Sequence, residues 1–156
     1  MLFLQTNTTT GIRHPGSQTH PVQVSHIRKS SATGESFLQL GRDYNFGNGV
    51  RKDPVQAVRC LRNGADLGNA MAQVALGGHY ERGTGVEMDE KEAVKWYKKA
   101  ADQNEAAGQY NLGKMYLFGR GVKRDEVEAV RLFKLAAAQG NEFAKDHLKK
   151  LMVKKP

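Results

Sequence analysis

The sequence predicts an all-α fold, an α/α superhelical solenoid of three 36-residue helix-turn-helix repeats followed by a C-terminal capping helix. A Leu-Gly pair recurs every 36 residues, and tyrosine, two glycines, valine, aspartate and an Ala-Val pair follow it at fixed offsets. Apolar residues have helical spacing inside each copy, and a glycine-rich turn divides each copy into two helices. Such helix pairs bury their apolar faces by stacking on one another. The copies are residues 36–71, 72–107 and 108–143, within an array that spans 36–153 and ends in a cap at 144–153.

The first helix of each copy carries an apolar stripe and ends at a glycine. In the second copy Leu76 and Tyr80 are spaced i, i+4, and Val74 extends the stripe by half a turn. A glycine just past a helix end adopts the left-handed backbone conformation at low cost, which makes it a common helix stop. The predicted stops are Gly47, Gly83 and Gly119.

A second glycine and a valine then reverse the chain, and an aspartate begins the second helix. An N-cap carboxylate accepts backbone N–H bonds and meets the positive end of the helix dipole. In the second helices, alanines face a glycine of the first helix, which lets the two helices approach closely. The predicted turn glycines are Gly49, Gly85 and Gly121, and the predicted caps are Asp53, Asp89 and Asp125.

The third turn, Gly119 to Asp125, also has the two glycines of a weak phosphate-loop motif. A phosphate loop needs a strand before it and a free helix N-terminus after it, whereas here a helix precedes and Asp125 occupies the N-terminus. We therefore interpret it as a corner of the repeat, and expect Arg120, Lys123 and Arg124 to be free surface residues.

The segment 144–153 is predicted to close the array as a capping helix. Phe143, Leu148, Leu151 and Met152 are expected to pack on the third copy, while the lysines stay in water. Because three copies are near the minimum for a stable array, we expect this cap to stabilise the third copy.

Residues 1–35 are predicted to be a disordered N-terminal extension, since the first 34 contain no acidic residue and show no apolar period. This composition leaves a targeting segment for organelle import, a linker and an artefact as alternatives. The longest apolar runs are far shorter than the ~20 residues needed to cross a bilayer, so we expect no transmembrane segment and a cytoplasmic protein. Residues 154–156 are predicted to be a basic tail.

The net charge of +8 comes mainly from the two ends of the chain, because residues 36–143 hold sixteen basic and fourteen acidic residues. A nearly neutral body argues against nucleic acid as the partner. Basic residues on the second helices recur with the period, and we expect them to form a solvated convex face rather than a track for an acidic ligand. They are Arg59, Arg62, Lys95, Lys98, Arg131 and Lys134.

Residues suited to catalysis or metal binding are sparse in the array. Ser36 is its last serine, and Thr84 is its only threonine. His79 and His147 lie at non-equivalent offsets, and Cys60 is expected to be a partly buried small hydrophobe. The sequence contains neither Ser-x-x-Lys nor Gly-x-Ser-x-Gly. We therefore predict no catalytic residue, no metal site and no cofactor.

The rest of the first-helix surface is the predicted partner-binding site. A mixture of aromatic residues, methionine and arginine on a concave face is typical of protein-binding hot spots. The alternative is that Phe46 and Phe118 fold under the neighbouring loop. The predicted contact residues are Arg42, Asp43, Phe46, His79, Arg82, Asn111, Lys114, Met115 and Phe118.

The repeat resembles the Sel1-like repeat, a relative of the tetratricopeptide repeat. The middle copy matches best, through LGGHYERGTGVEMDEKEAVKWYKKAADQN from Leu76 to Asn104. Tetratricopeptide arrays repeat every 34 residues and lack the Gly-x-Gly-Val turn. The resemblance covers about 36–153 and implies a right-handed superhelical scaffold whose concave side, lined by first helices, receives a protein partner.

The resemblance implies a non-enzymatic adaptor, as in family members that act in assembly, signalling or bacterial virulence. A cysteine-rich branch of the family has been linked to penicillin binding and β-lactam hydrolysis, but this chain lacks its paired cysteines. Two alternatives stay open: a β-lactam-type hydrolase, and a basic module that binds acidic protein, RNA or lipid. We expect a monomer or weak end-to-end self-association.

Overall fold

The computed structural model describes residues 33–153, and these form seven α-helices without a strand. The disordered extension predicted for 1–35 lies largely outside the described residues, and so does the basic tail 154–156. Equivalent helices begin 36 residues apart, which confirms the predicted solenoid of helix pairs. The helices are α1 (Gly34–Phe46), α2 (Pro54–Asp66), α3 (Ala70–Arg82), α4 (Glu90–Asp102), α5 (Ala106–Phe118), α6 (Glu126–Ala138) and α7 (Glu142–Val153).

The first helices begin two residues earlier than the copy boundaries at 36, 72, 108 and 144. Capping side chains set these positions, rather than the apolar pattern. The Thr33 hydroxyl accepts the N–H of Ser36 at 3.2 Å and starts α1. Asn69 and Asn141 act in the same way before α3 and α7, where their side chains accept backbone N–H groups at 2.8 and 2.9 Å.

The turns use the glycines and aspartates that recur in the sequence. Gly47, Gly83 and Gly119 follow the first helices with φ of 79°, 64° and 65°, in the left-handed region. The backbone N–H of each donates to the carbonyl oxygen four residues earlier. The second helices begin after Asp53, Asp89 and Asp125, whose carboxylates accept N–H bonds from the first turn.

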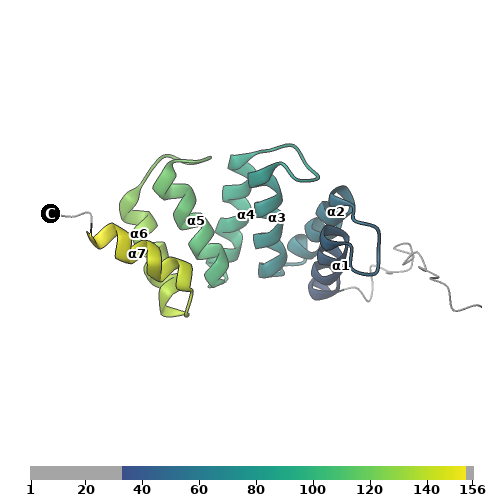
Figure 1. Ribbon diagram of the computed structural model, residues 1–156, viewed down its shortest axis with the longest axis horizontal. Coiled ribbons are helices and arrows are strands. Elements are labelled where there is room, and N and C mark those ends of the chain that lie inside the picture. Colours follow the sequence, from purple (N-terminus) through teal and green to yellow (C-terminus); the bar gives the residue numbers. More distant parts are fainter. Residues whose placement is uncertain (1–32, 154–156) are drawn as a thin grey trace, which may run out of the picture.

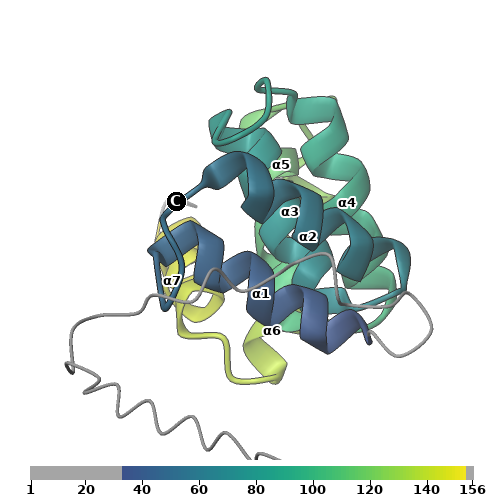
Figure 2. The same cartoon turned by 90° about the vertical axis from the view of Figure 1, so that its right-hand side faces the viewer.

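The helix pairs follow one another along the long axis, from α1 and α2 to α6 and α7 (Figure 1). Figure 2 looks along this array from the end at which α1 lies. Neighbouring first helices contact one another, α1 with α3 and α3 with α5, whereas no comparable contact joins the second helices among the described residues. The array therefore curves, and its first helices lie on the inner side.

Close approach of the two helices in a pair depends on a glycine in the first helix. A Cβ atom at Gly77 would lie 2.7 Å from the ring of Tyr97, and one at Gly113 would lie 2.7 Å from the ring of Phe133. Both rings are buried in the interior. The Leu-Gly pair thus leaves room for the large residue of the second helix.

α7 packs on α6 with Ala144 completely buried, and Leu148 and Leu151 contact the same apolar cluster. These three residues are spaced i, i+4, i+7 and define the buried face. Two further residues were expected to pack on the array. Phe143 is 69% exposed, but its ring centroid lies 5.9 Å from that of Tyr110 in α5, whereas Met152 is 75% exposed. The expectation is wrong for Met152, which lies about 100° around the helix from half-buried Leu151.

Candidate functional site on the inner surface

Each turn from the second repeat onward rests on the second helix of the preceding repeat. A Cβ atom at Gly85 would lie 2.1 Å from the Pro54 carbonyl oxygen, and one at Gly121 would lie 2.2 Å from the Glu90 carbonyl oxygen. Gly49 has the same left-handed conformation in the first repeat, yet no atom lies within 4 Å of its added Cβ. The turns therefore join successive repeats, and glycine permits the close approach.

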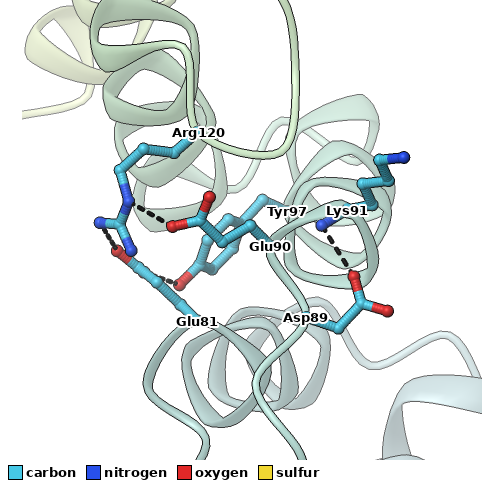
Figure 3. A network of polar contacts seen from close by, with 6 residues as sticks. All are labelled: Glu81, Asp89, Glu90, Lys91, Tyr97 and Arg120. Carbon is cyan, nitrogen blue, oxygen red and sulfur yellow. Dashed lines mark hydrogen bonds and ion pairs between the residues drawn. The ribbon is translucent and has the colours of Figure 1, made fainter.

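A polar network holds the third turn against the second repeat (Figure 3). Arg120 Nε donates to Glu90 Oε1 at 2.7 Å, and Arg120 Nη1 donates to Glu81 Oε1 at 2.9 Å. The Tyr97 hydroxyl donates to Glu81 Oε2 at 2.6 Å. Our expectation that Arg120 is a free surface residue is wrong, because the turn places its guanidinium between two carboxylates of the preceding repeat.

The network contains an ionised carboxylate and a protonated phenol, as expected of a structural contact. Burial raises the pKa of the Glu81 carboxyl, but the hydrogen bond from Tyr97 and the charges of Lys114 and Arg120 outweigh it and lower the pKa. Burial, together with the bond to Glu81, raises the pKa of the Tyr97 phenol. At neutral pH the carboxylate therefore accepts and the phenol donates, and neither is poised to transfer a proton.

Two glutamine pairs each join the two helices of one repeat, in the second and in the third repeat, at the ends away from the turn. Gln103 Nε2 donates to Gln73 Oε1 at 2.8 Å, and Gln139 Nε2 donates to Gln109 Oε1 at 2.8 Å. Gln73 Nε2 also donates to the Ala65 carbonyl oxygen of the preceding repeat at 3.1 Å. Our sequence analysis missed these residues, although their 36-residue spacing was a signal that could have found them.

The nine predicted contact residues differ in accessibility. Phe46 and Phe118 are 69% and 61% exposed, so the neighbouring loop does not cover them. Arg82 is also exposed, whereas His79 and Met115 are buried. The half-buried residues are Arg42, Asp43, Asn111 and Lys114.

His79 and Met115 are wrong as contact residues, and their position in the repeat explains why. They occupy equivalent positions, and Met115 lies in an apolar cluster shared with α3 and α4 of the preceding repeat. Asp43, the equivalent residue of the first repeat, is only half-buried. This position becomes buried where a preceding repeat covers it.

Aromatic residues gather where α5 meets α7. The Tyr110 ring centroid lies 5.9 Å from that of Phe143 and 5.6 Å from that of His147. Lys114 Nζ lies 5.5 Å from the Tyr110 ring centroid, within cation-π distance. Our sequence analysis missed this cluster because its residues come from two helices, α5 and α7, that are brought together only in the fold.

Beside these aromatics lies a cavity of about 600 Å³, which we call the α5–α7 groove. Its lining combines apolar side chains with basic ones and one carboxylate. The lining residues are Leu117, Phe118, Arg124, Glu126, His147, Lys150 and Leu151.

The described residues offer little for catalysis. No three His, Cys, Asp or Glu side chains within 33–153 are grouped so as to hold a metal ion. Cys60 is buried, and burial raises the pKa of its thiol, which disfavours the reactive thiolate. None of the helices in this part of the chain has the length and apolar character of a membrane span.

Buried His79 makes a testable contribution to stability. Burial lowers the pKa of its imidazole, although Nδ1–H donates to the Thr84 carbonyl oxygen at 2.6 Å and this bond opposes the shift. The unfolded chain therefore takes up a proton first as the pH falls below ~6.5. The contribution of neutral His79 is complete above that pH and is lost below it. We expect the free energy of unfolding, measured with urea, to decrease from about pH 7.5 to about pH 5.5.

The matched variant for this prediction is His79→Met, since methionine fills the equivalent buried position in the third repeat. It should fold and lose less stability than the wild type over the same pH interval. An identical pH dependence in both proteins would contradict the assignment to His79.

The sequence and the fold both match known repeat proteins. The family model described as Sel1 repeat matches residues 38–69, 70–105 and 106–141. No match was found among curated proteins. A Sel1 repeat protein from Oxalobacter formigenes is 39% identical with a TM-score of 0.69, and the similarity covers 75% of this chain and 88% of that protein.

Two further solved structures are similar. A protective antigen present in uropathogenic Escherichia coli strains, which displays an SLR fold, is 39% identical with a TM-score of 0.72 over 74% of this chain. The chain spans only 25% of that antigen. Cysteine rich protein B of Helicobacter pylori is 25% identical with a TM-score of 0.59, and the similarity covers 76% of this chain and 99% of that protein.

Proposed function

The chain belongs to the Sel1 repeat family, and we propose that it is a non-enzymatic adaptor that binds a protein or peptide partner on the inner surface of its solenoid. Curved arrays of helical repeats present extended concave surfaces of the kind that bind other proteins. The partner, on this proposal, contacts the first helices.

The distribution of aromatic residues carries this proposal. Of the three exposed phenylalanines of the described chain, Phe46 and Phe118 lie on first helices. The third, Phe143, lies on the capping helix α7, which begins 36 residues after α5 and so has the position of a first helix. The large aromatic residues of the second helices, such as Trp96 and Phe133, are buried. Exposed aromatic side chains gain the most from burial in an interface, and they dominate binding hot spots. The polar residues around them would form the rim of the interface.

The test replaces two of these residues, Phe46→Ala together with Phe118→Ala. Each hot-spot side chain contributes ~2 kcal/mol or more to binding, so we expect the affinity for the partner to fall by at least a hundredfold. The partner is first captured from the native host with the wild-type chain and identified by mass spectrometry. Its affinity for the wild-type and variant proteins is then measured by calorimetry.

A matched control is Met88→Ala with Val127→Ala, which removes two exposed apolar side chains outside the first helices. The control should bind like the wild type, and both variants should keep the wild-type helical signal and melting temperature. Equal affinity of the phenylalanine variant and the control would contradict the proposed surface. Turnover of a chromogenic β-lactam by the purified chain would contradict the non-enzymatic assignment.

A further inference from the structure

The α5–α7 groove is equivalent to the place that a turn occupies inside the array. The third turn rests on the second repeat, where Arg120 pairs with Glu81 and Glu90. The residues 36 positions after these two carboxylates are Leu117 and Glu126, and both line the groove. Lys150, also in the lining, is likewise the equivalent of Lys114, whose charge acts on Glu81. The groove thus has the layout of a turn-binding site.

The chemistry of the groove differs from that of the internal site. Inside the array a guanidinium meets the Glu81 carboxylate, which the Tyr97 hydroxyl also contacts. The residues equivalent to Glu81 and Tyr97 are Leu117, which lines the groove, and Phe133, and both are apolar. An arginine in the groove would find leucine in place of the carboxylate that Arg120 meets at Glu81. An apolar side chain would instead bury its surface against this leucine. The groove therefore favours leucine or methionine at the position of Arg120.

The residue after this apolar side chain must be glycine. Gly121 approaches the Glu90 carbonyl oxygen so closely that its added Cβ would lie only 2.2 Å from the oxygen. Its φ of 65° also lies in the left-handed region that favours glycine. Glu126 begins α6 as Glu90 begins α4, so its carbonyl oxygen presents the same constraint to a bound turn.

The rim of the groove is basic. Arg124 and Lys150 are exposed, and the one lining carboxylate, Glu126, already lies 3.6 Å from Arg124 Nη2. The wider surroundings have the same sign, since residues 106–153 contain nine basic and five acidic residues. Residues 34–105 contain ten basic and eleven acidic residues, so the positive charge is specific to this end of the described array. A partner segment with acidic residues on either side of its turn complements this rim.

We propose that the α5–α7 groove binds an acidic peptide segment that presents a leucine-glycine turn. This inference rests on the proposed adaptor function and deepens it, because it names the chemistry of the segment that the adaptor would recognise. The leucine packs on Leu117, the glycine approaches the Glu126 carbonyl oxygen, and the flanking carboxylates meet Arg124 and Lys150.

The experiment measures fluorescence anisotropy of a labelled synthetic peptide with a central Leu-Gly between aspartates and glutamates, titrated with the full chain. We expect saturable binding that weakens as salt is added. Peptides with Ser-Gly or Leu-Ala at the centre should bind at least tenfold more weakly, because one loses the apolar contact and the other places a Cβ against the carbonyl oxygen. Absence of saturable binding by the Leu-Gly peptide, or equal affinity for all three, would overturn the proposal.

Charge reversal at the rim tests the location. Arg124→Glu with Lys150→Glu should weaken binding of the acidic peptide about tenfold. The matched control is Lys123→Glu with Lys149→Glu, which changes the net charge equally at exposed residues outside the groove lining. Equal loss in both variants would show binding by overall charge alone and would overturn the groove assignment.

A specificity exchange is the strictest test. Leu117→Glu restores the carboxylate that the internal site has at Glu81, so an Arg-Gly peptide should gain affinity and the Leu-Gly peptide should lose it. Failure of this exchange in a folded variant contradicts the equivalence of the two sites. If Leu117→Glu does not fold, the comparison of the two charge-reversal variants decides whether the peptide binds in the groove.

Phe118 belongs both to the proposed inner surface and to the groove lining, so the two proposals are distinguished with Phe46→Ala alone. A chain that binds none of the peptides but loses capture of its partner on Phe46→Ala refutes the groove and leaves the adaptor function standing. A chain that binds the Leu-Gly peptide in the groove but whose Phe46→Ala variant captures the partner normally refutes the proposed inner surface instead.

Discussion

Replacing Gly121 with alanine is expected to lower the free energy of unfolding by about 3 kcal/mol, whereas Gly49→Ala should cost only about 1 kcal/mol. Both glycines have a left-handed backbone, with φ of 65° and 70°, so alanine pays the same conformational penalty at each. Only at Gly121 does the added Cβ meet another repeat, 2.2 Å from the Glu90 carbonyl oxygen. Urea denaturation followed by circular dichroism measures the two free energies.

The difference between these variants isolates the contact between repeats from the conformation of the turn. In an array of repeats, a weaker interface also uncouples the units on either side of it. We therefore expect Gly121→Ala to broaden the unfolding transition, because the third repeat and α7 separate from the first two. Equal destabilisation by both substitutions, with sharp transitions, would mean that the third turn does not carry the contact.

The fold could be predicted because its signals are local and repeated three times. A glycine stop such as Gly83 and an aspartate cap such as Asp89 act within a few residues of their own position. Their recurrence at one period left a single consistent arrangement of helices. Helix starts were less predictable, since Thr33 and Asn69 cap their helices outside the apolar pattern on which the copy boundaries were based.

Surface assignments failed where burial depends on how one repeat lies on the next. His79 and Met115 have the spacing of exposed first-helix residues, yet both are buried, and Met115 packs in a cluster with residues of the preceding repeat. Arg120 lies in a surface turn but reaches the carboxylates of Glu81 and Glu90. Only the relative placement of two repeats, which no single repeat encodes, determines these environments.

The candidate binding surfaces also differ in whether they could be predicted from the sequence of one repeat or only from the packing of several. Phe46 and Phe118 were found by comparing equivalent positions, because the arginine at 82 shows that the turn needs no aromatic residue there. The α5–α7 groove was not found, since its lining comes from α5, the third turn, α6 and α7. Once the packing is known, the period becomes informative again, because it relates Leu117 and Glu126 to the internal carboxylates that hold Arg120.

Leu76→Ala should produce the other large effect, a loss of about 2 to 5 kcal/mol in the free energy of unfolding. Leu76 is completely buried in the middle repeat, in a cluster that includes Leu38 of the first repeat and Met115 of the third. Truncation therefore leaves a cavity in the interior that the three repeats share, and surrounding side chains relax only partly into it.

The matched control for Leu76→Ala is Leu135→Ala on α6, which removes the same atoms from a side chain that is 40% exposed. The control should cost less than about 1 kcal/mol, because less apolar surface returns to water and no closed cavity forms. Since Leu76 contacts a cluster common to all three repeats, its loss should shift the whole urea transition without splitting it. A near-zero cost for Leu76→Ala would contradict its interior position, and a split transition would mean that the three repeats do not share one core.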